Sequence, residues 1–128
     1  MARDYKKIRA WQLADELAIL IYKVTTSFPK EEMFGLTNQM RRASVSVPAN
    51  IVEGSARNHI KEYLQFLYTA ISSLSELGYY IDFSYRIGFL KSNDFDILIS
   101  LYERTIKTLR ALITYIEKSK DQNLKSKV

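Results

Sequence analysis

The spacing of apolar residues constrains this chain more than any other feature, because they recur every three or four positions over long segments. One such series runs from Phe95 to Ile116. This spacing places the side chains on one face of an α-helix, whereas a strand requires alternation. It predicts four helices, over about 10–27, 35–54, 58–87 and from 93 onward. The connections are short, so we expect an all-α fold, an antiparallel up-down four-helix bundle.

The segment RRASVSVPANIVEG, residues 41–54, is a harder case because it combines a Ser-Val alternation with a proline. The apolar residues around it keep helical spacing: Leu36, Met40, Ala43, Val47 and Ile51. We therefore expect a helix that is kinked at Pro48, where the backbone N–H is missing. The alternative is a new helix beginning at Pro48, but its cap would be Val47, and valine caps poorly.

Small and polar residues mark the ends of the second and third helices. Asn50 and Glu53 share one polar flank of the second helix, which Gly54 is expected to end. Glu53 and Arg57 are four residues apart, a spacing that permits an ion pair across this corner. Gly88 suits a left-handed cap at the end of the third helix.

Length and composition indicate one domain with an added tail. Residues 1–120 are expected to form the bundle, and residues 121–128 a basic, flexible tail. The chain has no cysteine and no apolar run long enough to span a bilayer. We therefore expect a cytoplasmic protein without a membrane partner.

The net charge of +5 is unevenly distributed. Residues 1–9 carry +3, residues 41–61 carry +3 and residues 104–128 carry +5. Clustered positive charge attracts polyanions, above all nucleic acid. Within the central cluster, the candidate nucleic-acid residues are Arg41, Arg42, Arg57 and Lys61.

Catalytic, metal-binding and cofactor-binding patterns are scarce, so we expect no enzyme, no metal and no cofactor. His59 is the only histidine, and a lone histidine cannot build the paired sites that helical bundles use. The four glycines form no Gly-rich loop of the kind that holds a phosphate.

Surplus apolar residues extend beyond the core-facing stripes of the first and third helices. Large exposed apolar patches usually mark an interface. Packing within one bundle is the alternative, and for Trp11 and Phe66 the two explanations are evenly balanced. The candidate residues of a homo-oligomer interface are Trp11, Tyr22, Phe66, Tyr80, Phe83 and Ile87.

Two phrases, GLTNQMRRASVSVPANIVEGSARN and KEYLQFLYTAISSLSEL, occur in order after the opening DYKKIRAWQLADELAILIYKVTTSFPKEE. Together with IGFLKSNDFD, they resemble the 23S rRNA intervening-sequence protein family of bacterial four-helix-bundle proteins over residues 4 to about 118. The resemblance implies a homopentamer without enzymatic activity. A relative of the family, the accessory protein of diversity-generating retroelements, is a basic pentamer that binds nucleic acid and a reverse transcriptase.

Two departures from the family pattern concern packing and charge. Gly78-Tyr79-Tyr80 stands where the family usually has a polar helix turn, and a glycine there suggests close packing or a bend. The family's basic residues before KE are reduced to Arg57 and Lys61. On the charge and the family resemblance together, we expect a basic homo-oligomer, pentameric by that resemblance, that binds RNA or DNA as an accessory factor. The alternative is a structural or adaptor oligomer that binds a protein partner.

Overall fold

The structure is a computed structural model that describes residues 3–126 of the 128-residue chain, with side chains to residue 119. In this part of the chain all regular structure is helical, which confirms the predicted all-α four-helix bundle. The four long helices are α1 (Arg9–Thr25), α2 (Leu36–Ser55), α3 (Ile60–Arg86) and α4 (Ser92–Ser126). Two short 3-10 helices, η1 (Tyr5–Lys7) and η2 (Lys30–Glu32), precede α1 and α2.

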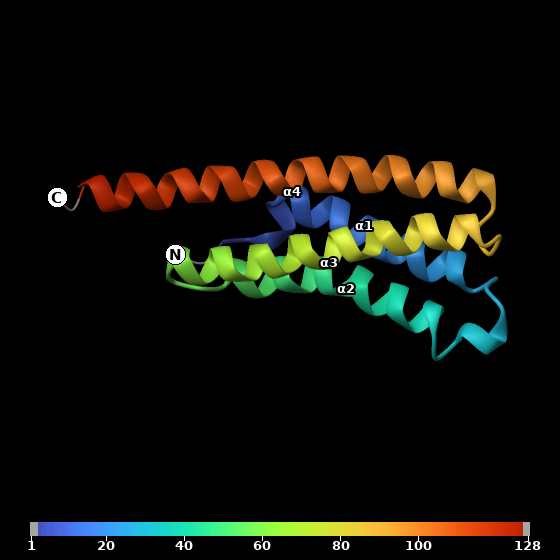
Figure 1. Cartoon of the computed structure of the whole chain (residues 1–128). Helices are drawn as coiled ribbons and strands as arrows, with labels where there is room; N and C mark the ends of the chain where they lie inside the picture. The colour runs from blue at the N-terminus through green and yellow to red at the C-terminus, as the bar shows by residue number, and fades with distance from the viewer. Residues whose placement is uncertain (1–2, 127–128) are drawn as a thin grey trace.

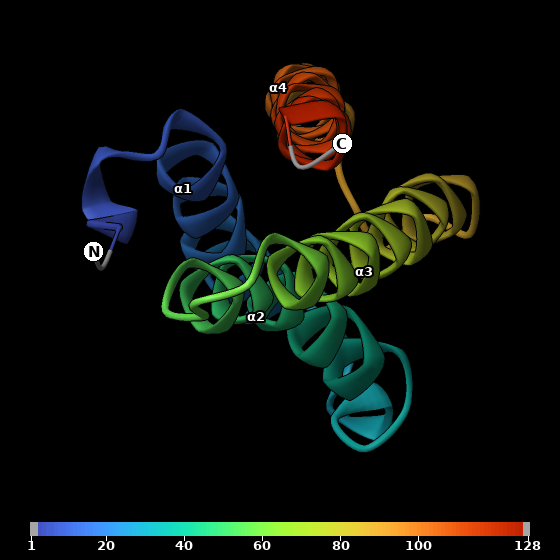
Figure 2. The ribbon, with the colours of Figure 1, turned by 90° about the vertical axis from the view of Figure 1, so that its left-hand side faces the viewer.

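The long helices lie side by side, and each packs against two others. In Figure 1, α1 and α3 run in one direction while α2 and α4 return. Viewed along the bundle, the four helices surround a common centre in the order α1, α2, α3, α4 (Figure 2). Contacts are most extensive between α2 and α3 and least extensive between α1 and α4. The α1–α4 seam is thus the loosest of the four.

The core consists of the apolar stripes from which the helices were predicted. Among the large side chains that are fully buried are Ile21 of α1, Met40 of α2, Leu74 of α3 and Leu109 of α4. Each lies on the stripe of its helix at a spacing of three or four from the next apolar residue.

Helix α2 passes through Pro48 without interruption, and the proline is buried. The helical interpretation of residues 41–54 is therefore correct, and no new helix begins at Pro48. The kink at Pro48 stays a prediction. Gly54 does not end the helix, which continues to Ser55 and closes with Ala56 in right-handed geometry.

Glycines at two positions have different physical roles. A Cβ added to Gly54 would lie 2.9 Å from both Phe66 Cβ and Tyr63 Cδ1, so Gly54 allows α2 and α3 to approach closely. Gly88 adopts a φ of 88°, which confirms the left-handed cap after α3.

Helix α4 is the longest element, and its 35 residues span about 52 Å at the usual helical rise. Its C-terminal part extends beyond the end of the bundle where α2 ends and α3 begins (Figure 1). The helix continues through Ser126, although the side chains of residues 120–128 lie outside the described part. The predicted flexible tail at 121–128 stays a prediction.

Among the described residues, no helix has both the length and the apolar character needed to cross a membrane.

Candidate nucleic-acid and assembly surfaces

The four predicted nucleic-acid residues lie in two separate places. Arg41 and Arg42 are close to the start of α2, whereas Arg57 and Lys61 flank the corner between α2 and α3. The intervening part of α2 alone is about 20 Å long. A single subunit therefore does not bring these four cations together.

Arg41 is engaged with the end of α1. Its Nε donates to Thr25 Oγ1 at 3.0 Å, and its Nη2 donates to the Tyr22 carbonyl at 3.3 Å. The guanidinium also lies 4.8 Å from the centre of the Tyr22 ring. These contacts join α1 to α2, so Arg41 has a structural role. Its neighbour Arg42 is exposed.

The α2–α3 corner is held by an N-terminal residue that sequence reasoning did not single out. Arg3 Nη1 donates to the carbonyls of Ser55 at 3.3 Å and Arg57 at 2.9 Å. The Arg3 guanidinium lies 4.4 Å from the centre of the Tyr63 ring. Burial raises the pKa of Tyr63, and the Arg3 charge partly opposes this shift. Arg3 thus bonds the last carbonyl of α2, that of Ser55, and a carbonyl of the turn that follows it.

The predicted ion pair between Glu53 and Arg57 is not formed. The ion pair found among the described residues joins Arg86 to Asp82 on α3, at 2.9 Å. Helix α2 ends at Ser55, so the helical spacing that brings residues four apart together no longer holds at Arg57. The Arg57 guanidinium instead lies 4.8 Å from the centre of the Phe66 ring.

The six candidate interface residues differ in exposure. Trp11, Phe66, Tyr80 and Phe83 are half-buried within the bundle. The exposed members are Tyr22 and Ile87, at 43% and 44%. The single bundle thus covers part of the surplus apolar surface.

Several exposed apolar residues were not predicted from the sequence. On α3, Tyr79 is 57% exposed, and its ring centre lies 6.0 Å from that of Phe83. Ile19 of α1 and Ile97 of α4 are about half exposed, and Phe34 before α2 is 94% exposed. The sequence indicates that Tyr79 belongs with Phe83 and Ile87, because spacings of four and eight residues place all three on one face of a helix. Tyr79, Phe83 and Ile87 are called the α3 ridge below.

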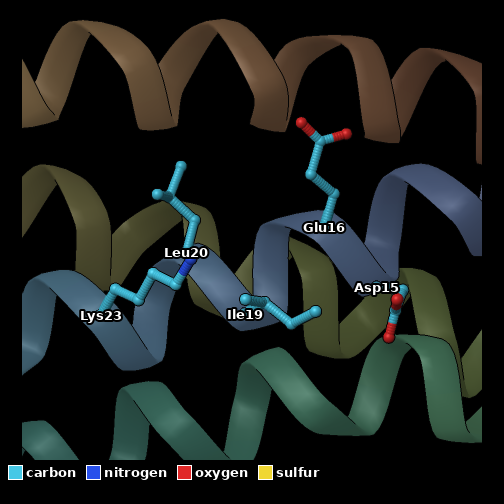
Figure 3. A pocket seen from close by; sticks show the side chains of 5 residues that line it. All are labelled: Asp15, Glu16, Ile19, Leu20 and Lys23. Carbon is cyan, nitrogen blue, oxygen red and sulfur yellow. The ribbon is translucent and has the colours of Figure 1, made fainter.

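Three adjoining hollows form a groove along α1, and the second and third segments of this groove lie at the loose seam between α1 and α4. The first, of about 340 Å³, is lined by Asp15, Glu16, Ile19, Leu20 and Lys23. Glu16 and Leu20 point toward α4, whereas Asp15 points toward α2 (Figure 3). The middle segment adds Asp96, Ile97 and Arg104 to Glu16 and Leu20.

The third segment of the groove, about 410 Å³, is strongly basic. It is lined by Arg9, Leu13, Arg104, Lys107, Thr108 and Ala111. In the sequence, residues 1–9 and 104–128 each carry net positive charge, and the fold brings Arg9 of the first region beside Arg104 and Lys107 of the second. We call these six residues the cationic groove.

Four tyrosines have a raised pKa, for example Tyr68, where a hydrogen bond to Glu117 is the largest cause, so each remains a neutral phenol at physiological pH. His59 is exposed at the start of α3. Within the described part of the chain, no three His, Cys, Asp or Glu side chains are grouped closely enough to hold a metal ion.

Comparisons with known proteins agree on family and fold. The family model described as "23S rRNA-intervening sequence protein" matches residues 6–111. A crystal structure from Bacteroides thetaiotaomicron VPI-5482, of a protein with unknown function from the S23 ribosomal protein family, has a TM-score of 0.73. It is 20% identical, and the alignment covers 81% of this chain and 97% of that one, so it supports the fold. No curated protein matches the chain.

Proposed function

The chain belongs to the 23S rRNA-intervening sequence protein family, and we propose that it is a basic homo-oligomeric bundle that binds RNA or other nucleic acid. In this proposal it acts as a non-enzymatic accessory factor, located in the cytoplasm and assembled as a pentamer. The pentamer follows from the resemblance of the sequence to this family.

The exposed, uncompensated positive charge carries the nucleic-acid part of the proposal. The chain has 19 Lys and Arg residues against 14 Asp and Glu, and the ion pair found in its described part uses one of these cations. Arg42, Lys61, Arg104 and Lys107 are all exposed. Repetition of such residues around an oligomer multiplies a modest local charge, and linked sites gain avidity from one another.

Exposed apolar residues on different faces support the oligomer. The α3 ridge lies on one helix, whereas Ile19 and Ile97 lie beside the α1–α4 groove. A contact between two different faces is heterologous, and such contacts close into rings when the rotation permits.

The assembly is tested by light scattering at micromolar concentration. We expect a mass several times that of the 14.9 kDa chain, and a monomer would contradict the proposal. Replacing Tyr79 and Ile87 with serine should weaken the assembly. The matched control is Tyr115→Ser, because Tyr115 is 68% exposed but lies far along α4 from the ridge.

Nucleic-acid binding is tested by mobility-shift titration with structured RNA, single-stranded RNA and duplex DNA. We expect binding that tolerates different sequences and weakens as salt rises from low to physiological concentration. Absence of binding to all three at low salt would exclude this part of the proposal.

The alternative function is that of an adaptor oligomer that binds a protein partner. Tyr79, the exposed aromatic residue of the α3 ridge, which lies beside the half-buried Phe83, favours it, since aromatic residues are enriched at protein interfaces. Stable assembly without nucleic-acid binding would make the adaptor the better description.

A further inference from the structure

The cationic groove has the composition of a phosphate-binding site, and an exposed aromatic residue follows it on the same helix. We propose that this groove holds the backbone of a single-stranded nucleic acid and that Tyr115 stacks on one of its bases. The inference rests on the proposed function and assigns it to the α1–α4 seam, in place of Arg41 and Arg57.

The fold brings three cations together from distant parts of the sequence. Arg9 is the first residue of α1, while Arg104 and Lys107 lie about one turn apart on α4. Arg9 Nη1 donates to Gln12 Oε1 at 3.2 Å, which leaves its other N–H groups available for a ligand. Thr108 adds a hydroxyl group to the lining, and Leu13, which is buried, adds an apolar side chain.

Among the residues whose side chains the structure describes, no carboxylate lines the cationic groove, so its three positive charges lie together without compensation from its lining. Glu16 and Asp96 border the adjoining middle segment together with Arg104, but neither forms an ion pair with it. An anion in the cationic groove relieves the mutual repulsion of Arg9, Arg104 and Lys107. The acidic residues next to it repel phosphates and direct a bound strand toward the C-terminal end of α4.

Helix α4 continues this path beyond the groove. Arg104, Thr108, Ala111 and Tyr115 follow one another at spacings of four, three and four, so they share one face of the helix. Tyr115 is 68% exposed and lies about 16 Å beyond Arg104 along the axis. A cationic track beside an exposed aromatic ring is the combination with which proteins bind single strands. This favours a single strand over a duplex, whose bases are already stacked.

The test is fluorescence anisotropy of the intact chain with a short labelled RNA of mixed sequence, as a single strand and as a duplex. The groove variant combines Arg104→Gln with Lys107→Gln. The matched control, Lys30→Gln with Lys91→Gln, removes the same charge from exposed positions in the segments before α2 and α4, outside the candidate binding surfaces. Circular dichroism and light scattering check that folding and assembly are unchanged.

Loss of two phosphate contacts should reduce the log–log salt slope for the single strand by about 1.4. This corresponds to about 25-fold weaker binding at roughly 0.1 M salt, relative to a reference near 1 M. Tyr115→Ala should weaken single-strand binding by about fivefold or more and leave duplex binding unchanged.

The possible failures are distinguishable. If the unmodified chain binds no nucleic acid, the proposed function itself is wrong. If it binds and the groove variant behaves like the control, the groove is not the site and this inference is overturned. Equal displacement of the RNA by polyglutamate would overturn the choice of ligand, because the groove would then accept any acidic chain.

Discussion

Gly54 offers a quantitative test of the packing between α2 and α3, the two helices in most extensive contact. An alanine Cβ at this position would lie 2.9 Å from Phe66 Cβ, 2.9 Å from Tyr63 Cδ1 and 3.3 Å from the Tyr63 carbonyl oxygen. Ordinary contacts between carbon atoms are about 3.5–4.0 Å. Two of the three atoms belong to the backbone or to a Cβ, so they cannot rotate away, and the helices must separate at this corner.

The expected cost follows from two opposing contributions. Overpacking of a tightly packed site costs about 1–3 kcal/mol. Replacing glycine with alanine within a helix gains up to about 1 kcal/mol, and less near a helix end. Since Gly54 is the second-last residue of α2, we expect Gly54→Ala to lower the free energy of unfolding by about 1–2 kcal/mol.

The measurement is urea unfolding followed by circular dichroism, at one fixed protein concentration because the chain is proposed to be oligomeric. Ala49→Gly is the control, since Ala49 is an exposed residue of α2 and this change alters helix propensity without adding a contact. This control should lower the free energy of unfolding by up to about 1 kcal/mol. Equal or higher stability of Gly54→Ala would refute the close-approach explanation.

Three further substitutions test other contacts by thermal or urea unfolding. Gly78→Ala places a Cβ 2.5 Å from Tyr102 Cζ, so it should destabilise the unmodified chain. In a Tyr102→Ala background the same change should stabilise the chain by about 1 kcal/mol, and the same effect in both backgrounds would contradict the contact. Gly88→Ala should cost about 1–2 kcal/mol because its φ is 88°, and an unchanged melting temperature would contradict this. Arg41→Lys keeps the charge but loses the hydrogen bonds to the end of α1, so the free energy of unfolding should fall by about 1 kcal/mol. The RNA affinity should be unchanged, and a large loss of affinity would show that Arg41 contacts the ligand.

The helices were predictable because each depends on a local pattern of apolar residues. The predicted helix over 10–27 corresponds to α1, which ends two residues earlier, at Thr25. The predicted start near residue 58 corresponds to α3, which begins at Ile60. Capping and fraying shift such boundaries by one or two residues without changing the face that each helix buries.

The candidate surfaces were less predictable because they depend on contacts between distant residues. Arg9 and Arg104 are far apart in sequence, and their proximity follows from the pairing of α1 with α4, which no local pattern specifies. Tyr79 and Tyr80 are neighbours that point about 100° apart around α3, so the packing of α3 in the bundle decides which of them is exposed. Arg41 was assigned to the ligand from its charge alone, whereas its side chain is bonded to the end of α1.

The salt dependence of RNA binding by the unmodified, assembled chain tests the central proposal most directly. The affinity for single-stranded RNA is measured by anisotropy over a series of salt concentrations, with the mass confirmed by light scattering. The proposal predicts an oligomer whose log affinity falls linearly with log salt, with a slope of at least about 2 for the three cations of one groove. A stable oligomer with no detectable RNA binding at low salt, or binding that does not change with salt, would contradict it.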